Sequence, residues 1–199
     1  MRPLPTDQLI IATHNTGKLR EFQQLLKSFV REIKSAGQLG LAEPEETGTT
    51  FTDNALLKAH AASKATGQVA LADDSGLCVS ALDGAPGIFS ARWGGEHRDM
   101  KLAMQRVHEE VGAAADHSAH FMCVLALVWP DGGSEIFQGR CEGTIIWPPR
   151  GDQGHGYDPI FVPKGDTRTF AEMSDVEKNA ISHRGLALKH LALRWAKKE

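Results

Sequence analysis

The chain has 199 residues, of which 41% are hydrophobic and 24% are charged, and its formal net charge is −3. This composition is typical of a globular protein with one substantial core. The sequence has no basic block, which argues against a nucleic-acid polymer as partner, because such proteins cluster Lys and Arg along one face. Binding of one small polyphosphate is not excluded, since a few Lys or Arg side chains close together and a metal ion suffice for it.

Two further protein classes are disfavoured by the sequence. The three cysteines, Cys78, Cys123 and Cys141, lie far apart and form no CxxC motif, which argues against a disulfide framework or a structural zinc site. No apolar run approaches the ~18 residues of a membrane span, and the N-terminus does not resemble a signal peptide. We therefore expect a cytoplasmic protein that does not associate with a membrane.

The first predicted elements are a buried strand at Gln8–Thr13, a polar turn and a helix. Apolar residues recur at helical spacing from Lys18 to Val30. Asn15 or Thr16 can cap this helix, whose backbone N–H groups would favour an anion. Lys18 opposes the helix dipole in the first turn, a cost that is more easily explained if the lysine binds a phosphate. The alternative is an ordinary turn with a solvated lysine.

Residues 32–50 are predicted to be irregular, and the acidic loop Glu43–Gly48 within them could supply a metal carboxylate. The next helix is predicted to be capped by Thr52 and to run to about Thr66. Lys58 lies on this helix and could reach a phosphate, but we prefer to interpret it as an exposed lysine.

An acidic segment follows this helix. The apolar runs 69–72 and 77–82 flank Asp73-Asp74-Ser75-Gly76, which predicts two short strands joined by an acidic turn. Side chains of consecutive residues on extended backbone point to opposite sides, so Asp73 and Asp74 should have different tasks. One of them could face a metal ion or water. The alternative is an ordinary solvated turn.

The second half of the chain is predicted to hold a helix at 100–111 and a hairpin of strands 119–129 and 134–140, with a possible extension to 147 past a bulge at Gly143. Residues 148–165 then form a glycine-rich loop. In this loop His155 and Tyr157 supply flat rings and Asp158 supplies a carboxylate. A ring between glycines can stack on a nucleic-acid base, and the alternative is a mobile connection.

Two helices are predicted near the C-terminus. Ser174 opens the first through a capping box, and Ser182 can cap the second. Lys178, His183 and Arg184 then cluster around the junction between the helices. Converging donors at a helix start suit an anion or the acceptor oxygens of a base. The alternative is a set of solvated charges.

Six motifs occur in order along nearly the whole chain: THNTGK (13–18), TFTDNALLKA (50–59), ADDSGL (72–77), GAPGIFSAR (84–92), GYDPIF (156–161) and EKNAISHRG (177–185). Together they resemble the inosine triphosphate pyrophosphatase family, also called XTP/dITP diphosphatases. The resemblance implies Mg²⁺-dependent hydrolysis of ITP, dITP and XTP to the monophosphate and pyrophosphate, which removes deaminated purines from the nucleotide pool. It also implies a homodimer and an α/β fold, in which one catalytic domain over residues 1–199 has two lobes, a long curved mixed sheet flanked by helices, and a central cleft.

The resemblance also assigns roles to individual residues. Asp74 would be the catalytic base and a metal ligand, with Glu46 and Asp73 as further candidate metal ligands. The predicted substrate-binding residues are Thr13, His14, Asn15, Thr16, Gly17, Lys18, Ser75, His155, Gly156, Tyr157, Asp158, Lys178, His183 and Arg184. The sequence departs from the family at His155, where Phe or Tyr is usual.

Two alternative functions stay open. One is a related pyrophosphatase that acts on modified pyrimidine or thymidine-type triphosphates. The other is a nucleotide-binding regulator that has no catalytic activity, against which the adjacent carboxylates Asp73 and Asp74 argue.

Overall fold

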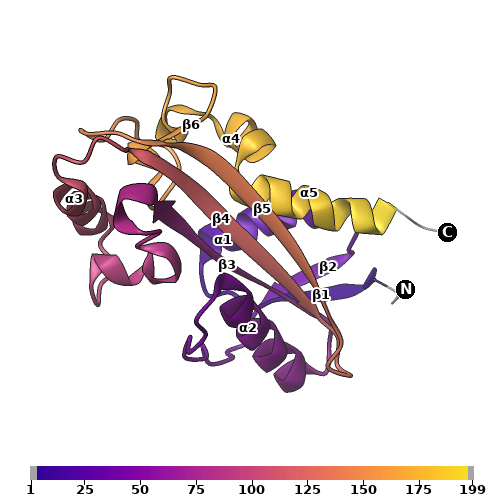
Figure 1. Ribbon diagram of the computed structural model, residues 1–199. Coiled ribbons are helices and arrows are strands. Elements are labelled where there is room, and N and C mark those ends of the chain that lie inside the picture. The colour runs from indigo at the N-terminus through magenta and orange to yellow at the C-terminus, as the bar shows by residue number, and fades with distance from the viewer. Residues whose placement is uncertain (1–3, 197–199) are drawn as a thin grey trace. The chain divides into compact units, whose positions relative to one another are not determined.

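A computed structural model describes residues 4–196, which form a mixed α/β structure (Figure 1). Six strands make one sheet in the order β2-β1-β3-β4-β5-β6. The elements are β1 (Gln8–Ile11), α1 (Thr16–Leu26), β2 (Glu32–Ser35), α2 (Phe51–Thr66), β3 (Ala70–Val79), α3 (Met100–Val111), β4 (Ser118–Val128), β5 (Ser134–Ile145), β6 (Phe161–Pro163), α4 (Asp175–Ile181) and α5 (His183–Ala196). Strand β1 pairs in parallel with β2 and β3, whereas β5 and β6 are antiparallel. The predicted α/β class with a mixed sheet is therefore confirmed.

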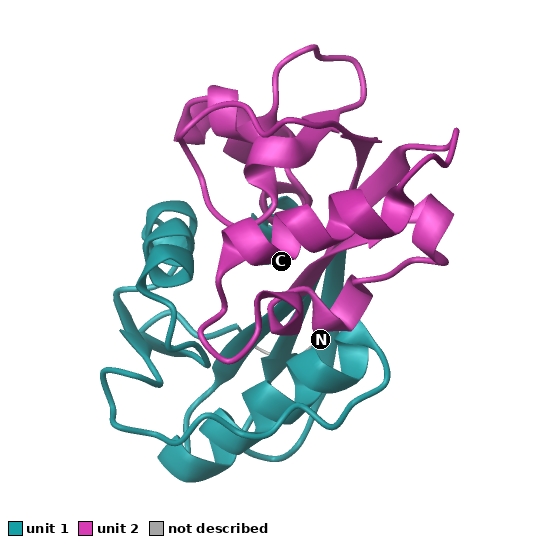
Figure 2. Cartoon of the chain, turned by 90° about the vertical axis from the view of Figure 1, so that its left-hand side faces the viewer, with its two compact units in different colours: residues 1–74, 124–138, 187–199 teal, residues 75–123, 139–186 magenta. Residues whose placement is uncertain are grey.

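The chain divides into two compact units, coloured separately in Figure 2. Unit 1 holds the described residues up to 74, together with 124–138 and 187–196. Unit 2 holds residues 75–123 and 139–186. The division falls within β3, β4 and β5, so each of these long strands contributes residues to both units.

In unit 1, the chain runs from β1 through α1 to β2 and then back across β1 to β3. Since such parallel crossovers are right-handed, this reversal places α1 and α2 on opposite faces of the sheet. Figure 1 shows α2 on one side, with α1 and α5 on the other. Ala62 of α2 packs on Ile10 and Ala70, and the ring of Phe29 stacks on Trp195 of α5 at 5.7 Å.

The point where the strand order reverses is where α/β sheets commonly bind ligands, beyond the carboxyl ends of the strands. Ile11 ends β1 and lies opposite Leu71 of β3. Residues Thr13–Lys18 leave the sheet at this position, while β3 continues into Asp73 and Asp74. The fold thus brings two of the predicted motifs to one edge of unit 1.

Unit 2 has a core in which α3 packs with aromatic side chains. Ala103, Met104 and Val107 of α3 belong to one buried cluster with Phe121, Phe161 and Phe170. The ring centroids of Phe121 and Phe161 lie 4.6 Å apart. This cluster supports the segments that carry the C-terminal motifs.

Several predicted boundaries need correction. The acidic segment is not a turn between two short strands, because β3 continues without a break through Asp73–Gly76. Buried positions on both sides of β3 stabilise it as a strand although its centre is polar. A short strand, β2, lies in residues predicted to be irregular, and β6 lies in the predicted loop 148–165.

Other corrections concern helix ends and the hairpin. Helix α1 begins at Thr16 and ends at Leu26 instead of reaching Val30. Helix α2 is capped by Thr50, whose hydroxyl accepts from Asp53 in a capping box, and not by Thr52. Strand β5 does extend past Gly143, as far as Ile145. Among residues 4–196, no helix is long and apolar enough to cross a membrane. The single domain and the central cleft stay predictions.

Candidate active site

The carboxylates of Asp73 and Asp74 lie on extended backbone in β3 and bind different lysines. Lys18 Nζ donates to Asp73 at 3.0 Å, and Lys58 Nζ donates to Asp74 at 2.8 Å. Both residues are buried, with exposed fractions of 3% and 6%. The neighbouring carboxylates thus have different lysine partners, and their having different tasks stays a prediction.

The turn after β1 is held by its own side chains. Asn15 Oδ1 accepts from the backbone N–H groups of Gly17 and Lys18, and so caps α1 as predicted. The backbone N–H of Asn15 in turn donates to Thr13 Oγ1 at 3.1 Å. His14 Nε2 lies 2.7 Å from the carbonyl oxygen of Leu41. Two amides of the expected anion site are thus taken by the cap. The Lys18 ammonium of the same turn is paired with Asp73, and its binding of a phosphate stays a prediction.

Lys58 is buried, so its interpretation as an exposed lysine is wrong. Only 8% of the residue is exposed, and Nζ contacts Glu46 at 2.6 Å as well as Asp74 at 2.8 Å. The helix α2 approaches the sheet closely because Ala55 and Ala62 lie on the same face as Lys58. A lysine within a stripe of alanines was the signal in the sequence for this burial.

Asn54 is a site residue that the sequence analysis missed. It is 1% exposed, and its Oδ1 accepts from the backbone N–H of Gly48 at 2.9 Å. Its Nδ2 donates to Asp74 at 3.5 Å. A Cβ on Gly48 would collide with Asn54, so the glycine lets the loop approach closely. Asn54 therefore ties the loop that carries Glu46 to the carboxylate of Asp74. Its position one helical turn before Lys58 was the available signal.

Burial acts on both members of the Lys58–Asp74 pair. For Asp74, burial raises the carboxyl pKa, and the charge of Lys58 offsets this only in part. For Lys58, burial lowers the pKa, but the charges of Asp74 and Asp73 outweigh it and raise the pKa overall. Lys58 is thus an ammonium at neutral pH, and Asp74 accepts a proton more readily than an ordinary aspartate does.

In unit 2, Asp158 organises the loop that carries His155. Its Oδ2 accepts from the backbone N–H of His155 at 2.7 Å and from Lys178 Nζ at 2.6 Å. The side chains of Asp158 and Lys178 are only 2% and 7% exposed. Gly154 has φ of 72°, and a Cβ there would collide with the Asp158 carboxylate. The glycine before His155 is therefore required both by its backbone conformation and by this close contact.

The start of α5 places His183 and Arg184 inside unit 2, each 5% exposed. The His183 ring stacks on Phe121, with centroids 4.6 Å apart and an angle of 14° between the planes. Ser182 caps α5 as predicted, because its hydroxyl accepts from the backbone N–H of Gly185 at 3.1 Å. With Lys178 also buried, the alternative of solvated charges at this junction is wrong.

Tyr157 and Ser90 hold the segment that follows β3. The Tyr157 hydroxyl donates to the carbonyl oxygen of Ser90 at 2.8 Å. The Ser90 hydroxyl accepts from the backbone N–H of Leu77 at 2.9 Å and donates to the carbonyl oxygen of Gly87. A Cβ on Gly76 would collide with both Gly87 and Ser90. Tyr157 thus holds the backbone of Ser90, and the Ser90 hydroxyl in turn binds the backbone of Leu77, two residues after Ser75. Ser90 is a second residue that sequence analysis missed.

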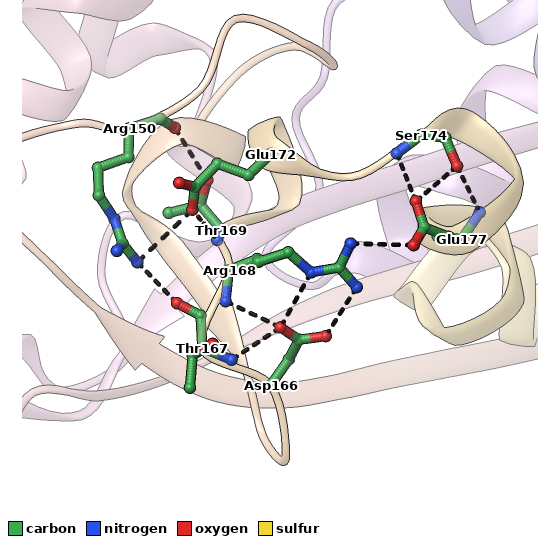
Figure 3. A network of polar contacts seen from close by, with 8 residues as sticks. All are labelled: Arg150, Asp166, Thr167, Arg168, Thr169, Glu172, Ser174 and Glu177. Carbon is green, nitrogen blue, oxygen red and sulfur yellow. Dashed lines mark hydrogen bonds and ion pairs between the residues drawn. The ribbon is translucent and has the colours of Figure 1, made fainter.

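A polar network, shown in Figure 3, anchors the two ends of the His155 loop. Arg150 donates to the carbonyl oxygen of Thr167 at 2.8 Å, and its own carbonyl accepts from Thr169 Oγ1. Arg168 binds Asp166 through two nitrogens and reaches Glu177 at 2.9 Å. Glu177 belongs to the predicted capping box of α4, so the network connects the loop to the helix that carries Lys178.

The cysteines offer no nucleophile in this structure. Burial raises the pKa of both Cys78 and Cys141 to about 11, so both are neutral thiols at physiological pH. All three cysteines are buried.

Comparison with known proteins gives one consistent result. The sequence profile of the Ham1 family matches residues 9–194. The dITP/XTP pyrophosphatase of Gluconobacter oxydans is 59% identical over 189 residues, which is 94% of this chain and 91% of that protein. The dITP/XTP pyrophosphatase of Zymomonas mobilis is 55% identical over 193 residues, or 96% and 92% of the two chains.

Solved structures agree with these sequence matches. A HAM1 protein from Coxiella burnetii is similar with a TM-score of 0.89 and 42% identity, and the match covers 96% of this chain and 99% of that one. The Ham1 protein of Staphylococcus aureus is similar with a TM-score of 0.87 and 36% identity, over 96% and 100% of the two chains.

Proposed function

The chain belongs to the Ham1 family, and on this premise we infer that it is a dITP/XTP pyrophosphatase. It hydrolyses nucleoside triphosphates of deaminated purines to the monophosphate and pyrophosphate. ITP is included because inosine and deoxyinosine carry the same base. The observation that carries this assignment is 59% identity over nearly the full length to a protein of this activity.

We assign the triphosphate to the lysine–carboxylate group, which consists of Lys18, Glu46, Lys58, Asp73 and Asp74. Cleavage between the α- and β-phosphates requires neutralisation of phosphate charge, a positioned water and a stabilised pyrophosphate leaving group. Lys18 and Lys58 supply two ammonium groups within this group. Asp74, whose pKa is raised by burial, is the base that takes the proton from the attacking water.

The donor set of this group fits Mg²⁺. Within residues 4–196, no three His, Cys, Asp or Glu side chains gather closely enough to hold a metal ion by themselves. Mg²⁺ does not need such a cage, since proteins usually hold it through one or two carboxylates together with water and substrate phosphates. Glu46 and Asp74 are two such carboxylates that already share one cation, the Lys58 ammonium. Asp73 is a further candidate ligand. When bound, Mg²⁺ would neutralise phosphate charge and make the attacking water more acidic.

We assign the base to the segments around His155 and His183. A site that presents donors to the O6 oxygen of hypoxanthine or xanthine leaves them unpaired against the amino group of adenine, which is costly when the donors are buried. Arg184, which is 5% exposed, and the backbone N–H groups near His183 are the candidate donors. Lys178 and Asp158 hold the two segments that carry these groups and the His155 loop.

A pyrophosphate-release assay across nucleotides tests the assignment. With Mg²⁺, we expect pyrophosphate from dITP, XTP and ITP, and far less from dATP, dGTP and modified pyrimidine triphosphates. Release should stop when the metal is chelated. Stepwise release of orthophosphate would contradict the proposed reaction, and a preference for pyrimidine triphosphates would favour the related pyrophosphatase instead. Binding of ITP without turnover would favour the regulator.

We expect His155 to stack on the purine base. The residue is exposed between two glycines of positive φ, so its ring can cover a base plane without a backbone clash. Since ring–base stacking is worth on the order of 1–3 kcal/mol, His155→Ala should raise KM for ITP by about tenfold, with a smaller effect on kcat. His155→Phe should keep or lower KM, because Phe has the larger ring. Steady-state kinetics of both variants decide the role: equal damage from Phe and Ala would indicate a hydrogen bond instead of stacking.

The proposal includes a homodimer. It is supported by the family resemblance and by large apolar side chains that unit 2 exposes, among them Phe89, Leu102 and Trp147, at 47%, 57% and 43%. Such exposure is common where a protein contacts a partner. Sedimentation equilibrium should give twice the mass of one chain, and a single-chain mass throughout the micromolar range would contradict this expectation.

A further inference from the structure

The carboxylates of Glu46 and Asp74 share a cation that belongs to the chain itself. Lys58 Nζ lies 2.6 Å from Glu46 and 2.8 Å from Asp74, and the lysine is 8% exposed. Buried carboxylates are costly unless a cation and hydrogen bonds compensate them. The ammonium provides this compensation from within the fold, at the position where two carboxylates converge.

We propose that Lys58 is an internal competitor for the divalent cation: the metal ion binds Glu46 and Asp74 only by displacing the Lys58 ammonium from them. This inference rests on the proposed function, which places Mg²⁺ at these two carboxylates. It goes further by assigning to Lys58 control over when the metal ion binds.

The physical reason is charge balance. A divalent cation and an ammonium that meet the same two oxygens repel each other strongly in a buried site, because the effective dielectric constant is low. The displaced ammonium then needs another anion, and the substrate's phosphates are anions of suitable charge. Metal ion and triphosphate should therefore bind cooperatively. The metal ion frees the Lys58 ammonium to bind phosphate, and the phosphates compensate the ammonium that the metal ion displaces. Without nucleotide, the metal ion should bind weakly.

Lys58→Met tests this inference by direct binding of Mn²⁺ in the absence of nucleotide. Methionine keeps much of the length and apolar volume of the lysine stem but removes the charge. Electron paramagnetic resonance of free Mn²⁺ measures the dissociation constant without any turnover. We expect Lys58→Met to bind Mn²⁺ at least about tenfold more tightly than the unaltered chain, within the usual range of coupling between ligands.

Two control variants make the comparison specific. Lys64→Met removes the same charge from an exposed position in the last turn of the same helix and should bind Mn²⁺ as the unaltered chain does. Lys58→Arg keeps the positive charge next to the carboxylates and should bind Mn²⁺ as weakly as the unaltered chain. Tight binding by Lys58→Arg would show that geometry and not charge was the cause, and would overturn the proposal.

The remaining outcomes also decide the question. Unchanged or weaker Mn²⁺ binding by Lys58→Met would overturn competition by Lys58. If Lys58→Met does not fold alone, Mn²⁺ should restore its circular dichroism spectrum, because the metal ion replaces the missing cation. Failure of millimolar Mn²⁺ to do so would also overturn the proposal. Failure of the proposed function is distinguishable, since it would appear as absent pyrophosphate release by the unaltered chain.

Discussion

Asp74→Asn is expected to lower kcat for dITP or XTP by roughly 10²-fold or more, the usual contribution of a general base. Asparagine keeps the shape of the side chain but neither accepts a proton nor carries a charge for a metal ion. Steady-state pyrophosphate release at saturating substrate and Mg²⁺ measures the effect. A near-normal kcat would show that another group is the base.

The Asp74→Asn variant should still fold. Burial raises the pKa of this carboxyl, which means that the position disfavours the charged form. A neutral asparagine is therefore tolerated better here than at an exposed position where the carboxylate is fully solvated. Lys58 also keeps its second partner, Glu46, at 2.6 Å. Asp83→Asn is the matched control, because Asp83 is exposed with φ of 51°, a conformation that asparagine tolerates. The control should retain full activity, and thermal unfolding of both variants should resemble that of the unaltered chain.

Lys178→Met should cause the largest loss of stability. It leaves the carboxylate of Asp158, 2% exposed, without its 2.6 Å ammonium partner. Breaking a buried ion pair from one side typically costs about 3–5 kcal/mol, because the remaining charge is buried and uncompensated. At about 2–4 °C per kcal/mol for a chain of this size, thermal unfolding should occur roughly 10 °C lower. Calorimetry or circular dichroism measures this shift.

Arg168→Met is the control for this effect. Arg168 lies in the same unit and binds Asp166 and Glu177, but its side chain is 44% exposed (Figure 3). Exposed pairs contribute little to stability because water screens them, so this variant should unfold close to the unaltered chain. The double variant Lys178→Met with Asp158→Asn should recover part of the loss, since the buried charge is then gone. A stable Lys178→Met chain, or equal damage from Arg168→Met, would contradict this account of the site.

Local signals in the sequence predicted much of this protein. The strand before Thr13, the Asn15 cap and the Ser174 capping box depend on residues a few positions apart, so spacing alone indicates them. The ordered motifs identified the family, and the comparisons confirm it. The mixed α/β fold followed from that resemblance and not from periodicity.

Local signals gave a wrong prediction for the acidic segment, where long-range packing determines the secondary structure. Asp-Asp-Ser-Gly is typical of a turn, but in the structure β3 runs through it, because apolar residues on both sides bury the strand. Turn propensity is a weak preference that burial of a whole strand overrides.

The partners within the site were decided by tertiary structure alone. Lys58 contacts Asp74 sixteen residues away, and Lys178 contacts Asp158 twenty residues away. Whether a lysine is a solvated charge or the buried partner of a carboxylate depends on which face of its helix the sheet covers. The sequence by itself therefore determined the family and the local caps. The fold determined which charges meet, because the cost of a buried charge is offset only by a partner that folding brings to it.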